Sequence, residues 1–269
     1  WKMAGANKVL EALAEVFPQA DIYALFGEKD SLSASLKKHN IYYSFLNKVP
    51  FIKYFYRYTL HLWPMAVEQF DLSEYDLIIS NTSSVSHGVI TPPNSKHVLY
   101  INSPMRYIWD LQSLYFDVVK FGFLKRVAVR FLLVFSRMWD VVAAQRGRIL
   151  ISNSNFTAKR VEKYWDRKVD KVIYPPVNIY RGKVQAKREN YYLAGAPFEP
   201  NKRGDFLLKC ASEIGFNIKI MGTGSMRKGL KKKYCKFKNI EILDWVSEKE
   251  KWELISNAKG FVVAGIEDY

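Results

Sequence analysis

Short apolar runs alternate along the chain with longer segments in which apolar residues recur every three or four positions. Runs of the first kind have the length of buried β-strands, and the second pattern is typical of helices with one apolar face. Strands that alternate with helices form parallel sheets covered by helices, so the pattern predicts an α/β protein. The expected strands fall at 22–25, 76–80, 97–101 and 149–152, and then at 191–194, 217–221, 240–243 and 261–264.

The segment 148–176 has the pattern of strand, helix and strand. Ser154 or Asn155 can cap the helix expected at 156–165, because a side-chain oxygen there can accept a bond from a free backbone N–H. The two prolines at 175–176 remove backbone donors and end the second strand. The segment therefore closes one group of strands.

A basic, polar segment follows at 178–190 and offers no periodic apolar face. Such a segment is typical of a linker. The sequence therefore predicts two domains, 1–177 and 178–269, and 269 residues are enough for each to bury its own core.

Three motifs, in this order, resemble family 4 of the retaining glycosyltransferases: YINSPMRYIWD at 100–110, SNSNFTAKR at 152–160 followed by IYPPV at 173–177, and GFVVAGIEDY at 260–269. The resemblance covers the chain from Gly5 to Tyr269. It implies the fold called GT-B, in which two Rossmann-like lobes place parallel sheets on either side of a crevice. By the same resemblance the chain looks cut at both ends, and the second lobe looks incomplete.

The resemblance also implies a nucleotide-sugar donor site, most of it in the second domain. Lys202 and Arg203 follow a strand and precede a helix, where two cations can neutralise a diphosphate leaving group; a solvated charged loop is the alternative. Glu267 is the implied catalytic residue, because the family places its first motif glutamate against the donor sugar. The other implied donor-binding positions are Gly5, Gly222, Gly224, Trp245, Val246, Asp268 and Tyr269.

The first domain would then carry the acceptor side. Asn102 stands where the family commonly has a histidine, and an asparagine can bind a sugar hydroxyl but cannot act as a base. His87 can replace that histidine, or it can be a structural residue beside Gly88. The resemblance places Arg106, Tyr107 and Asp110 on the same rim, with packing as the alternative for Tyr107.

The net charge of +15 is concentrated in a few segments. Between Lys120 and Arg148 there are seven basic residues and one acid, on a helical pattern with an apolar stripe. The stripe is either lobe core with the cations on its solvated face, or a surface for anionic lipid and a lipid-linked acceptor. Aromatic residues between cations at 48–63 favour the same two interpretations. The stripe consists of Leu124, Val127, Ala128, Phe131, Phe135, Met138 and Val142.

Several features are missing from the sequence. It contains no uncharged apolar run of 18 residues, so no membrane-spanning helix is expected. The two cysteines cannot form a disulfide framework, which favours a cytoplasmic protein. If the basic, apolar segments are a lipid surface, the protein would be peripheral on the inner face of the cell membrane. No Asp-x-Asp pair occurs, and the histidines and cysteines are scattered, so we predict neither a metal nor another cofactor.

The sequence thus predicts a glycosyltransferase that moves a sugar from a nucleotide diphosphate donor to a cell-surface glycan, with a lipid-linked acceptor. The resemblance is to mannosyltransferases of polysaccharide assembly, so GDP-mannose is the first donor to test. The alternative is a polyanion-binding or nucleic-acid-binding protein without catalysis, since residues 227–238 carry seven cations and no acid. No nucleic-acid fold signature supports that alternative, and nucleic acid is not a predicted partner.

Overall fold

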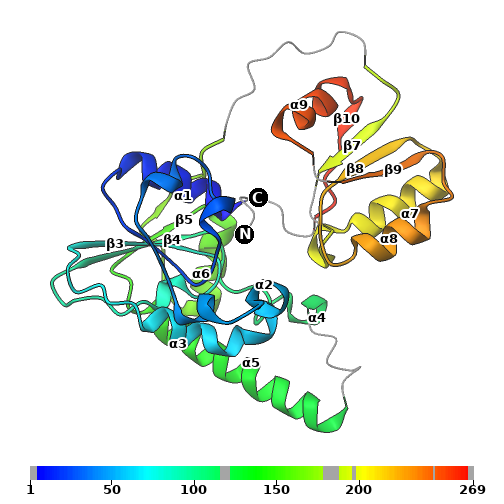
Figure 1. Cartoon of the computed structure of the whole chain (residues 1–269). Helices are drawn as coiled ribbons and strands as arrows, with labels where there is room; N and C mark the ends of the chain where they lie inside the picture. Colours follow the sequence, from blue (N-terminus) through cyan, green and yellow to red (C-terminus); the bar gives the residue numbers. More distant parts are fainter. Residues whose placement is uncertain (1–4, 116–121, 178–187, 196–197, 245, 266–269) are drawn as a thin grey trace. The chain divides into compact units, whose positions relative to one another are not determined.

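The computed structural model of the chain describes residues 5–115, 122–177, 188–195, 198–244 and 246–265. The chain divides into two compact units, Trp1–Val177 and Asn178–Tyr269 (Figure 1). Each unit contains a four-stranded parallel sheet with helices packed against it. The α/β prediction is therefore confirmed.

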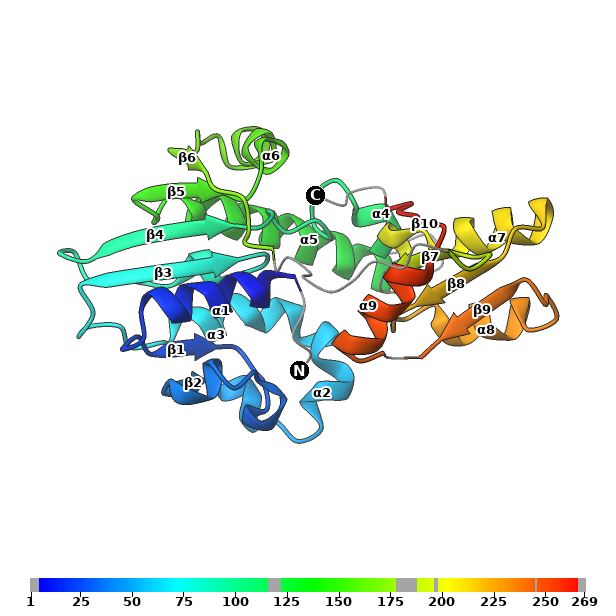
Figure 2. The same cartoon turned by 90° about the horizontal axis from the view of Figure 1, so that it is seen from above.

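The main sheet of unit 1 runs in the order β3, β4, β5 and β6. Two further short strands, β1 and β2, pair with each other and form a separate sheet. Seen from above, β1 lies between β2 and β3 (Figure 2). Strand β2 was not predicted, because a strand of three residues leaves little pattern in the sequence. The bounds are β1 Ile22–Ala24, β2 Ile41–Tyr43, β3 Leu77–Thr82, β4 Lys96–Ile101, β5 Ile149–Ser152 and β6 Lys171–Val172.

Helices cover both faces of this sheet. Helix α1 lies on one face of β3, and α3 and α5 lie on the other (Figure 1). Helix α6 packs Val161 and Trp165 against Leu99 and Leu150 of the central strands. The helices are α1 Ala6–Val16, α2 Ile52–Phe55, α3 Trp63–Glu68, α4 Gln112–Tyr115, α5 Phe123–Ala144 and α6 Asn155–Trp165, with 3₁₀ turns η1 Lys29–Ser31, η2 Leu36–Lys38, η3 Phe45–Lys48, η4 Tyr56–Leu62 and η5 Ser86–Gly88.

Unit 2 has the same three layers. Its strands follow the order β10, β7, β8 and β9. Leu208 and Leu230, of α7 and α8, pack on one face of the sheet, and Leu254 of α9 packs on the other. The elements are β7 Tyr192–Gly195, η7 Pro200–Lys202, α7 Gly204–Ile214, β8 Ile218–Met221, α8 Arg227–Tyr234, β9 Ile240–Leu243, α9 Glu248–Asn257 and β10 Gly260–Phe261.

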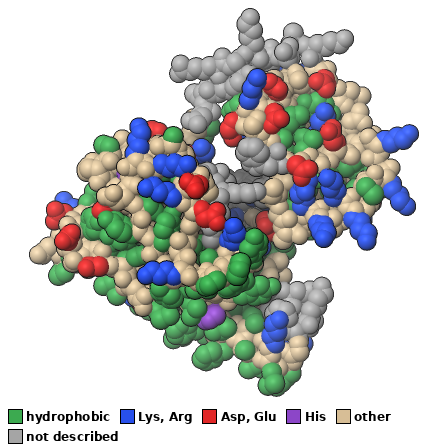
Figure 3. Space-filling model, in the orientation of Figure 1, with side chains coloured by type: hydrophobic (Ala, Val, Ile, Leu, Met, Phe, Trp, Pro, Cys, Tyr) green, Lys and Arg blue, Asp and Glu red, His purple; other side chains and the backbone are tan. Residues whose placement is uncertain are grey.

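The apolar stripe predicted between Lys120 and Arg148 lies on α5, and it is not core. The side chains of Leu124 and Phe131 are 82% and 71% exposed, and the rest of the stripe is exposed as well. The helix is fixed to the unit by a different set of residues, Leu133, Asp140, Ala143 and Ala144. Figure 3 shows hydrophobic side chains gathered on the surface in the region of α3, η4 and α5. The interpretation of the stripe as lobe core is therefore wrong.

Candidate active site

The cationic loop of unit 2 lies between β7 and α7. Lys202 ends the turn η7, and Arg203 takes a left-handed conformation (φ 51°) immediately before the helix. The Arg203 Nε lies 3.4 Å from Asp205 Oδ1, and its guanidinium lies 5.6 Å from the centre of the Phe206 ring. Both cations are partly exposed at the amino end of an eleven-residue helix. Free N–H groups and the helix dipole favour an anion at such a position.

The glycine turn after β8 joins this loop through backbone bonds. The Phe198 N–H donates to the Thr223 carbonyl at 2.9 Å, and the Met226 N–H donates to the Phe198 carbonyl at 3.0 Å. A Cβ on Gly224 would lie 2.5 Å from the Phe198 carbonyl, and Gly222 has a φ of 147°. The turn therefore requires glycine at both positions for its own backbone.

Glu199 and Ser225 make a second link between the two loops. The Ser225 hydroxyl donates to Glu199 Oε2 at 2.8 Å, and the Ser225 N–H donates to Oε1 at 3.3 Å. One strand further along, Arg227 of α8 pairs with Asp244. Charged and polar groups thus follow three consecutive strands at their carboxyl ends, which is where open α/β sheets bind ligands.

Four of the predicted donor-side residues, Trp245, Glu267, Asp268 and Tyr269, lie outside the described residues, and their roles stay predictions. Val246 is described, and it packs partly buried against the core cluster of β7, β8 and α9.

At the carboxyl end of the unit 1 sheet, two asparagines connect β3, β4 and α1. The Asn102 Nδ2 donates to Asn81 Oδ1 at 2.6 Å and to the Thr82 carbonyl at 3.2 Å. The Asn81 Nδ2 donates to the Ala6 carbonyl at 2.6 Å, next to Gly5, which is exposed. Both amide hydrogens of Asn102 are thus used within the unit, and its Oδ1 is the group that can accept a bond from a ligand.

Helix α6 begins at the same edge. The Ser154 hydroxyl accepts a bond from the Thr157 N–H at 3.1 Å, as the predicted cap requires. The Thr157 hydroxyl donates to the Asn102 carbonyl at 3.3 Å, which fixes the loop after β4 against the helix. Four elements of unit 1 therefore meet around Asn102. Asn81 and Thr82 were not among the predicted site residues, although small polar residues directly after an apolar run are a detectable signal.

The three rim residues differ in their surroundings. Asp110 Oδ1 pairs with the buried Arg160 at 2.5 Å, so its carboxylate is already neutralised. The Tyr107 hydroxyl lies 2.6 Å from Ser84 Oγ, and burial raises the pKa of Tyr107 well above its usual range. Arg106 is partly exposed. Asp110 is paired with Arg160, whereas Arg106 has no ion pair within the described part of the chain.

His87 is buried in the core of unit 1 and does not line a surface. It has no exposed area; its Nδ1 lies 3.2 Å from Thr82 Oγ1 and its Nε2 lies 3.2 Å from Asp140 Oδ1. The rings of Trp139 and Trp165 pack against it. The expectation of an acceptor-side role for His87 is corrected on this ground, and the structural interpretation holds.

Asp140 was missed by the sequence analysis. It is fully buried on α5, and its Oδ2 accepts bonds from the indole N–H groups of Trp109 at 2.8 Å and Trp165 at 2.7 Å. A signal existed in the sequence, since Asp140 is the single acid between Lys120 and Arg148. Isolated acids on apolar helices are buried only with partners.

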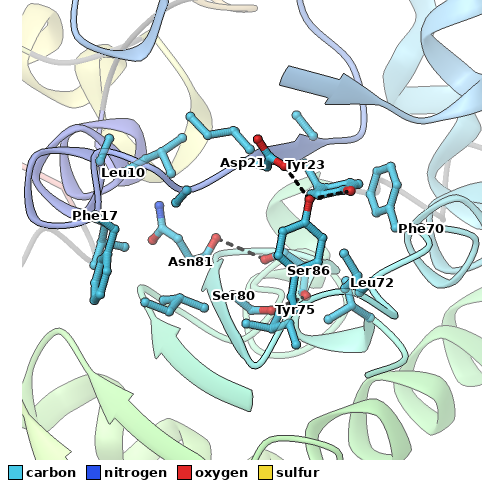
Figure 4. Close-up of a pocket in the computed structure, with 18 of the residues that line it drawn as sticks. Leu10, Phe17, Asp21, Tyr23, Phe70, Leu72, Tyr75, Ser80, Asn81 and Ser86 are labelled. Atoms are coloured by element: carbon cyan, nitrogen blue, oxygen red, sulfur yellow. Dashed lines mark hydrogen bonds between the residues drawn. The ribbon is translucent and has the colours of Figure 1, made fainter. Parts of the chain in front are cut away.

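A pocket of about 680 Å³ lies in unit 1 between α1, β1 and β3 (Figure 4). Its lining includes Leu10, Phe17, Leu72 and Ile78, and the Tyr75 hydroxyl beside it donates to Asp21 Oδ2 at 2.5 Å. None of the residues predicted for the donor or acceptor side is among those that line it. Its lining does include Ala6 and Asn81, so the pocket adjoins the edge of the sheet at which Asn102 lies.

A scan against protein-family models gave no match, and a search of curated proteins gave none either. Among solved structures the chain is similar to a mutant of S. aureus TarM in complex with fondaparinux, alpha-GlcNAc-glycerol and UDP (12% identity, 77% of this chain and 40% of that chain, TM-score 0.48). It is similar to the pneumococcal O-GlcNAc transferase GtfA in complex with UDP and GlcNAc (10% identity, 77% and 40%, TM-score 0.42). It is also similar to an alpha-glucosyltransferase in complex with UDP-glucose and DNA containing an abasic site (13% identity, 97% and 68%, TM-score 0.48).

The chain spans 40% of the length of the first two of these proteins. Within the described ranges, no helix is both long and apolar enough to cross a membrane, and no group of three His, Cys, Asp or Glu side chains is placed to hold a metal ion.

Proposed function

We propose that the chain acts as a retaining GT-B glycosyltransferase that transfers a sugar from a nucleotide diphosphate donor to a glycan. The donor base and sugar are proposed as those of GDP-mannose. Unit 2 would bind the donor, and unit 1 would bind the acceptor. The three sequence motifs and the two α/β units support this proposal.

The observation that carries the proposal is the paired loop at the carboxyl ends of β7 and β8. Lys202 and Arg203 lie at the amino end of α7, and backbone bonds fix their loop to the glycine turn that ends at Gly224. A diphosphate leaving group gains negative charge as the glycosidic bond breaks, and fixed cations and N–H groups stabilise that charge. We propose that these groups take the place of a metal ion, so that the transfer reaction of this protein needs none.

On the acceptor side we propose that Asn102 binds a sugar hydroxyl through Oδ1, with Arg106 beside it. Asn81 holds the Asn102 amide in place, so the carbonyl oxygen is oriented before the ligand arrives. Preorganised groups of this kind lower the cost of orienting an acceptor. We propose Glu267 as the residue that holds the donor sugar for attack.

We further propose that unit 1 lies on an anionic membrane surface, at the cytoplasmic face, where a lipid-linked acceptor is reached. On α5, Leu124, Phe131 and Phe135 are exposed beside Lys125 and Arg130. A second exposed aromatic group stands on α2 and η4 among further cations: Phe51, Tyr54 and Tyr58 with Lys53 and Arg57. Apolar side chains ringed by cations suit the boundary between anionic headgroups and acyl chains.

The test is a transfer assay with GDP-mannose, UDP-glucose and dTDP-glucose as donors and undecaprenyl diphosphate-linked sugar as acceptor. Release of a nucleoside diphosphate that depends on the acceptor is the expected result, and retention would be read from the anomeric configuration of the product. Lys202→Ala with Arg203→Ala should abolish it, whereas Lys236→Ala with Lys238→Ala, two exposed cations ahead of β9, should not. No release with any donor, together with tight binding of a DNA oligonucleotide that the second pair weakens, would favour the polyanion-binding alternative.

A further inference from the structure

The loop that carries the two proposed phosphate-binding cations also carries an acid, Glu199. The Lys202 N–H donates to the Glu199 carbonyl at 2.9 Å, so a single turn of chain separates the acid from Lys202 and Arg203. A carboxylate at this position repels any anion that the cations bind. The charge of Glu199 thus opposes the role proposed for its two neighbours.

Contacts with the glycine turn after β8 fix the Glu199 carboxylate. The Ser225 hydroxyl donates to Oε2 at 2.8 Å, and the Ser225 N–H donates to Oε1 at 3.3 Å. Next to Glu199, the Phe198 backbone bonds to Thr223 and Met226. The negative charge is therefore held between the loops that follow β7 and β8 and lead into α7 and α8, two helices that lie side by side (Figure 1).

The nearby arginines do not need Glu199 as a counter-ion. The Arg203 Nε lies 3.4 Å from Asp205 Oδ1, and the guanidinium of Arg227 pairs with Asp244. The link to the glycine turn does not need a charge either, because the oxygen of a neutral amide has two lone pairs and could accept the same two bonds. The carboxylate therefore adds a negative charge that these local contacts do not require.

The proposed reaction changes the charge of the nucleotide. A sugar nucleotide carries about two negative charges on its diphosphate, and the free diphosphate carries about one more near neutral pH, because its terminal phosphate can ionise a second time. Cations attract the more negative product more strongly than the donor, and a fixed acid repels it more strongly.

The acid is close enough for this repulsion to act. Residues at the two ends of a turn lie within about 7 Å of each other, measured between Cα atoms. The Debye length at physiological ionic strength is about 8 Å, so salt screens the repulsion only in part.

We propose that Glu199 is a specificity-determining residue of the donor site, which disfavours the nucleoside diphosphate product relative to the sugar nucleotide. This inference rests on the proposed function, the binding of a diphosphate at Lys202 and Arg203. The two cations favour the product, and the fixed acid reduces that preference. Glu199 thus speeds release of the product, a step that limits turnover in many enzymes.

The competing role for Glu199 is purely structural, as a link that holds the two loops together. Loss of such a link would alter the binding of every ligand of the site, the uncharged nucleoside included. Loss of a charge has a different signature, because the gain in affinity increases with the negative charge of the ligand and decreases with added salt. The two roles are therefore separable by measurement.

The test is isothermal titration calorimetry of the wild type and of Glu199→Gln at pH 7.5, in low salt and without divalent cations. The ligands form two series of increasing charge: guanosine, GDP-mannose and GDP, and uridine, UDP-glucose and UDP. We expect the variant to bind the diphosphate about tenfold more tightly and the sugar nucleotide about fourfold more tightly, with no change for the nucleoside. In 0.5 M NaCl the gain for the diphosphate should fall to about twofold.

Two control variants separate charge from structure. Ser225→Ala removes the hydroxyl that holds the carboxylate but keeps the charge, so it should give no gain in diphosphate affinity. Glu213→Gln makes the same chemical change at an exposed position near the carboxyl end of α7, about 13 Å along the helix from Gly204, and should leave all affinities unchanged. The melting temperatures of all three variants should stay near that of the wild type.

The outcomes distinguish this inference from the proposed function. An equal change for all ligands of a series, or the same gain in Ser225→Ala as in Glu199→Gln, would overturn the inference in favour of the structural role. Binding of a diphosphate by the wild type with no gain in Glu199→Gln would contradict the inference alone. Binding of no nucleotide by either form would contradict the proposed function as well.

Discussion

The carboxylate of Asp140 lies 3.2 Å from the imidazole of His87, measured from Oδ1 to Nε2, and neither side chain is exposed. The other carboxylate oxygen accepts from the indoles of Trp109 and Trp165. One buried charge on α5 thus connects the strand end at Thr82, through His87, with the segment that follows β4 and with α6. These segments carry Asn102 and Ser154, the cap of α6. The buried network therefore holds in place the carboxyl end of the unit 1 sheet, where we propose that the acceptor binds.

Replacing Asp140 by alanine would leave the indole N–H groups of Trp109 and Trp165 buried without partners and would remove the carboxylate beside His87 Nε2. We expect the free energy of unfolding to fall by about 3–5 kcal/mol, the cost of breaking a buried polar network on one side. Urea denaturation measures this loss. The matched control is Glu162→Ala, an exposed acid on α6, which should change stability by less than about 0.5 kcal/mol. A loss at Asp140 no larger than at Glu162 would contradict the role given to this carboxylate.

His97 makes stability depend on pH. Burial lowers the pKa of His97 from 6.5 to about 4, and its Nε2 lies 2.9 Å from Ser80 Oγ. The unfolded chain takes up this proton at a higher pH than the folded chain does. The free energy of unfolding should therefore be fully retained above the ordinary pKa and should fall as the pH is lowered from 6.5 towards 4, by about 3 kcal/mol in total.

The measurement is urea denaturation at pH 7.5 and pH 4.5 for the wild type and for His97→Gln. The variant should lose most of the difference between the two pH values. His61→Gln, which alters an exposed histidine on η4, should keep it. If the His97 variant retained the full pH dependence, another group would have to be responsible.

Most strands of the two four-stranded sheets follow directly from short apolar runs, and β9 begins and ends at the predicted residues, Ile240 and Leu243. The face of α5 that is buried does not follow in the same way. A stripe of apolar residues shows that a helix has an apolar face, but the element that covers this face is elsewhere in the chain or outside it. Here the buried contacts use Leu133, Asp140, Ala143 and Ala144, and the residues of the predicted stripe are exposed to solvent.

The candidate site was predictable only in part. Lys202 with Arg203, and the glycine turn at 222–224, each follow a predicted strand directly, so local pattern finds them. The Asn81–Asn102 pair and the His87–Asp140 pair join residues 21 and 53 positions apart. Such contacts depend on the register of the sheet and on the helix that crosses it, and neither is encoded in a local pattern.

Two glycines in the same region should respond with opposite sign to substitution by alanine. At Gly224 the new Cβ would lie 2.5 Å from the Phe198 backbone, which cannot move without opening the loop. We expect a loss of about 1–3 kcal/mol and weaker binding of a nucleoside diphosphate. At Gly229 nothing lies within 4 Å, and the position is inside α8, so alanine should stabilise by about 0.5–1 kcal/mol. Thermal unfolding measures the change in stability of both variants. An equal loss of stability for Gly229→Ala and Gly224→Ala would contradict the close contact between Gly224 and the Phe198 backbone.

Substitution of the exposed face of α5 should separate membrane binding from folding. Leu124→Gln, Phe131→Gln and Phe135→Gln together should reduce cosedimentation with phosphatidylglycerol vesicles more than tenfold, because each buried apolar side chain contributes about 1.5–3 kcal/mol. The melting temperature should stay near that of the wild type. Val16→Gln with Ile214→Gln, two exposed apolar residues on other helices, is the control and should leave vesicle binding unchanged. A large drop in melting temperature for the α5 variant would instead place this face in a protein interface.

The central claim is that Lys202 and Arg203 bind the diphosphate of a nucleotide donor. The most direct measurement is thermal unfolding with GDP, UDP and dTDP, and with the corresponding nucleosides, for the wild type and for Lys202→Ala with Arg203→Ala. A diphosphate at 100 times its dissociation constant should stabilise the wild type by about 2.7 kcal/mol. We predict that one diphosphate does so, that the double variant loses this effect, and that the nucleoside response changes little. Equal stabilisation of wild type and variant by the diphosphate would contradict the account.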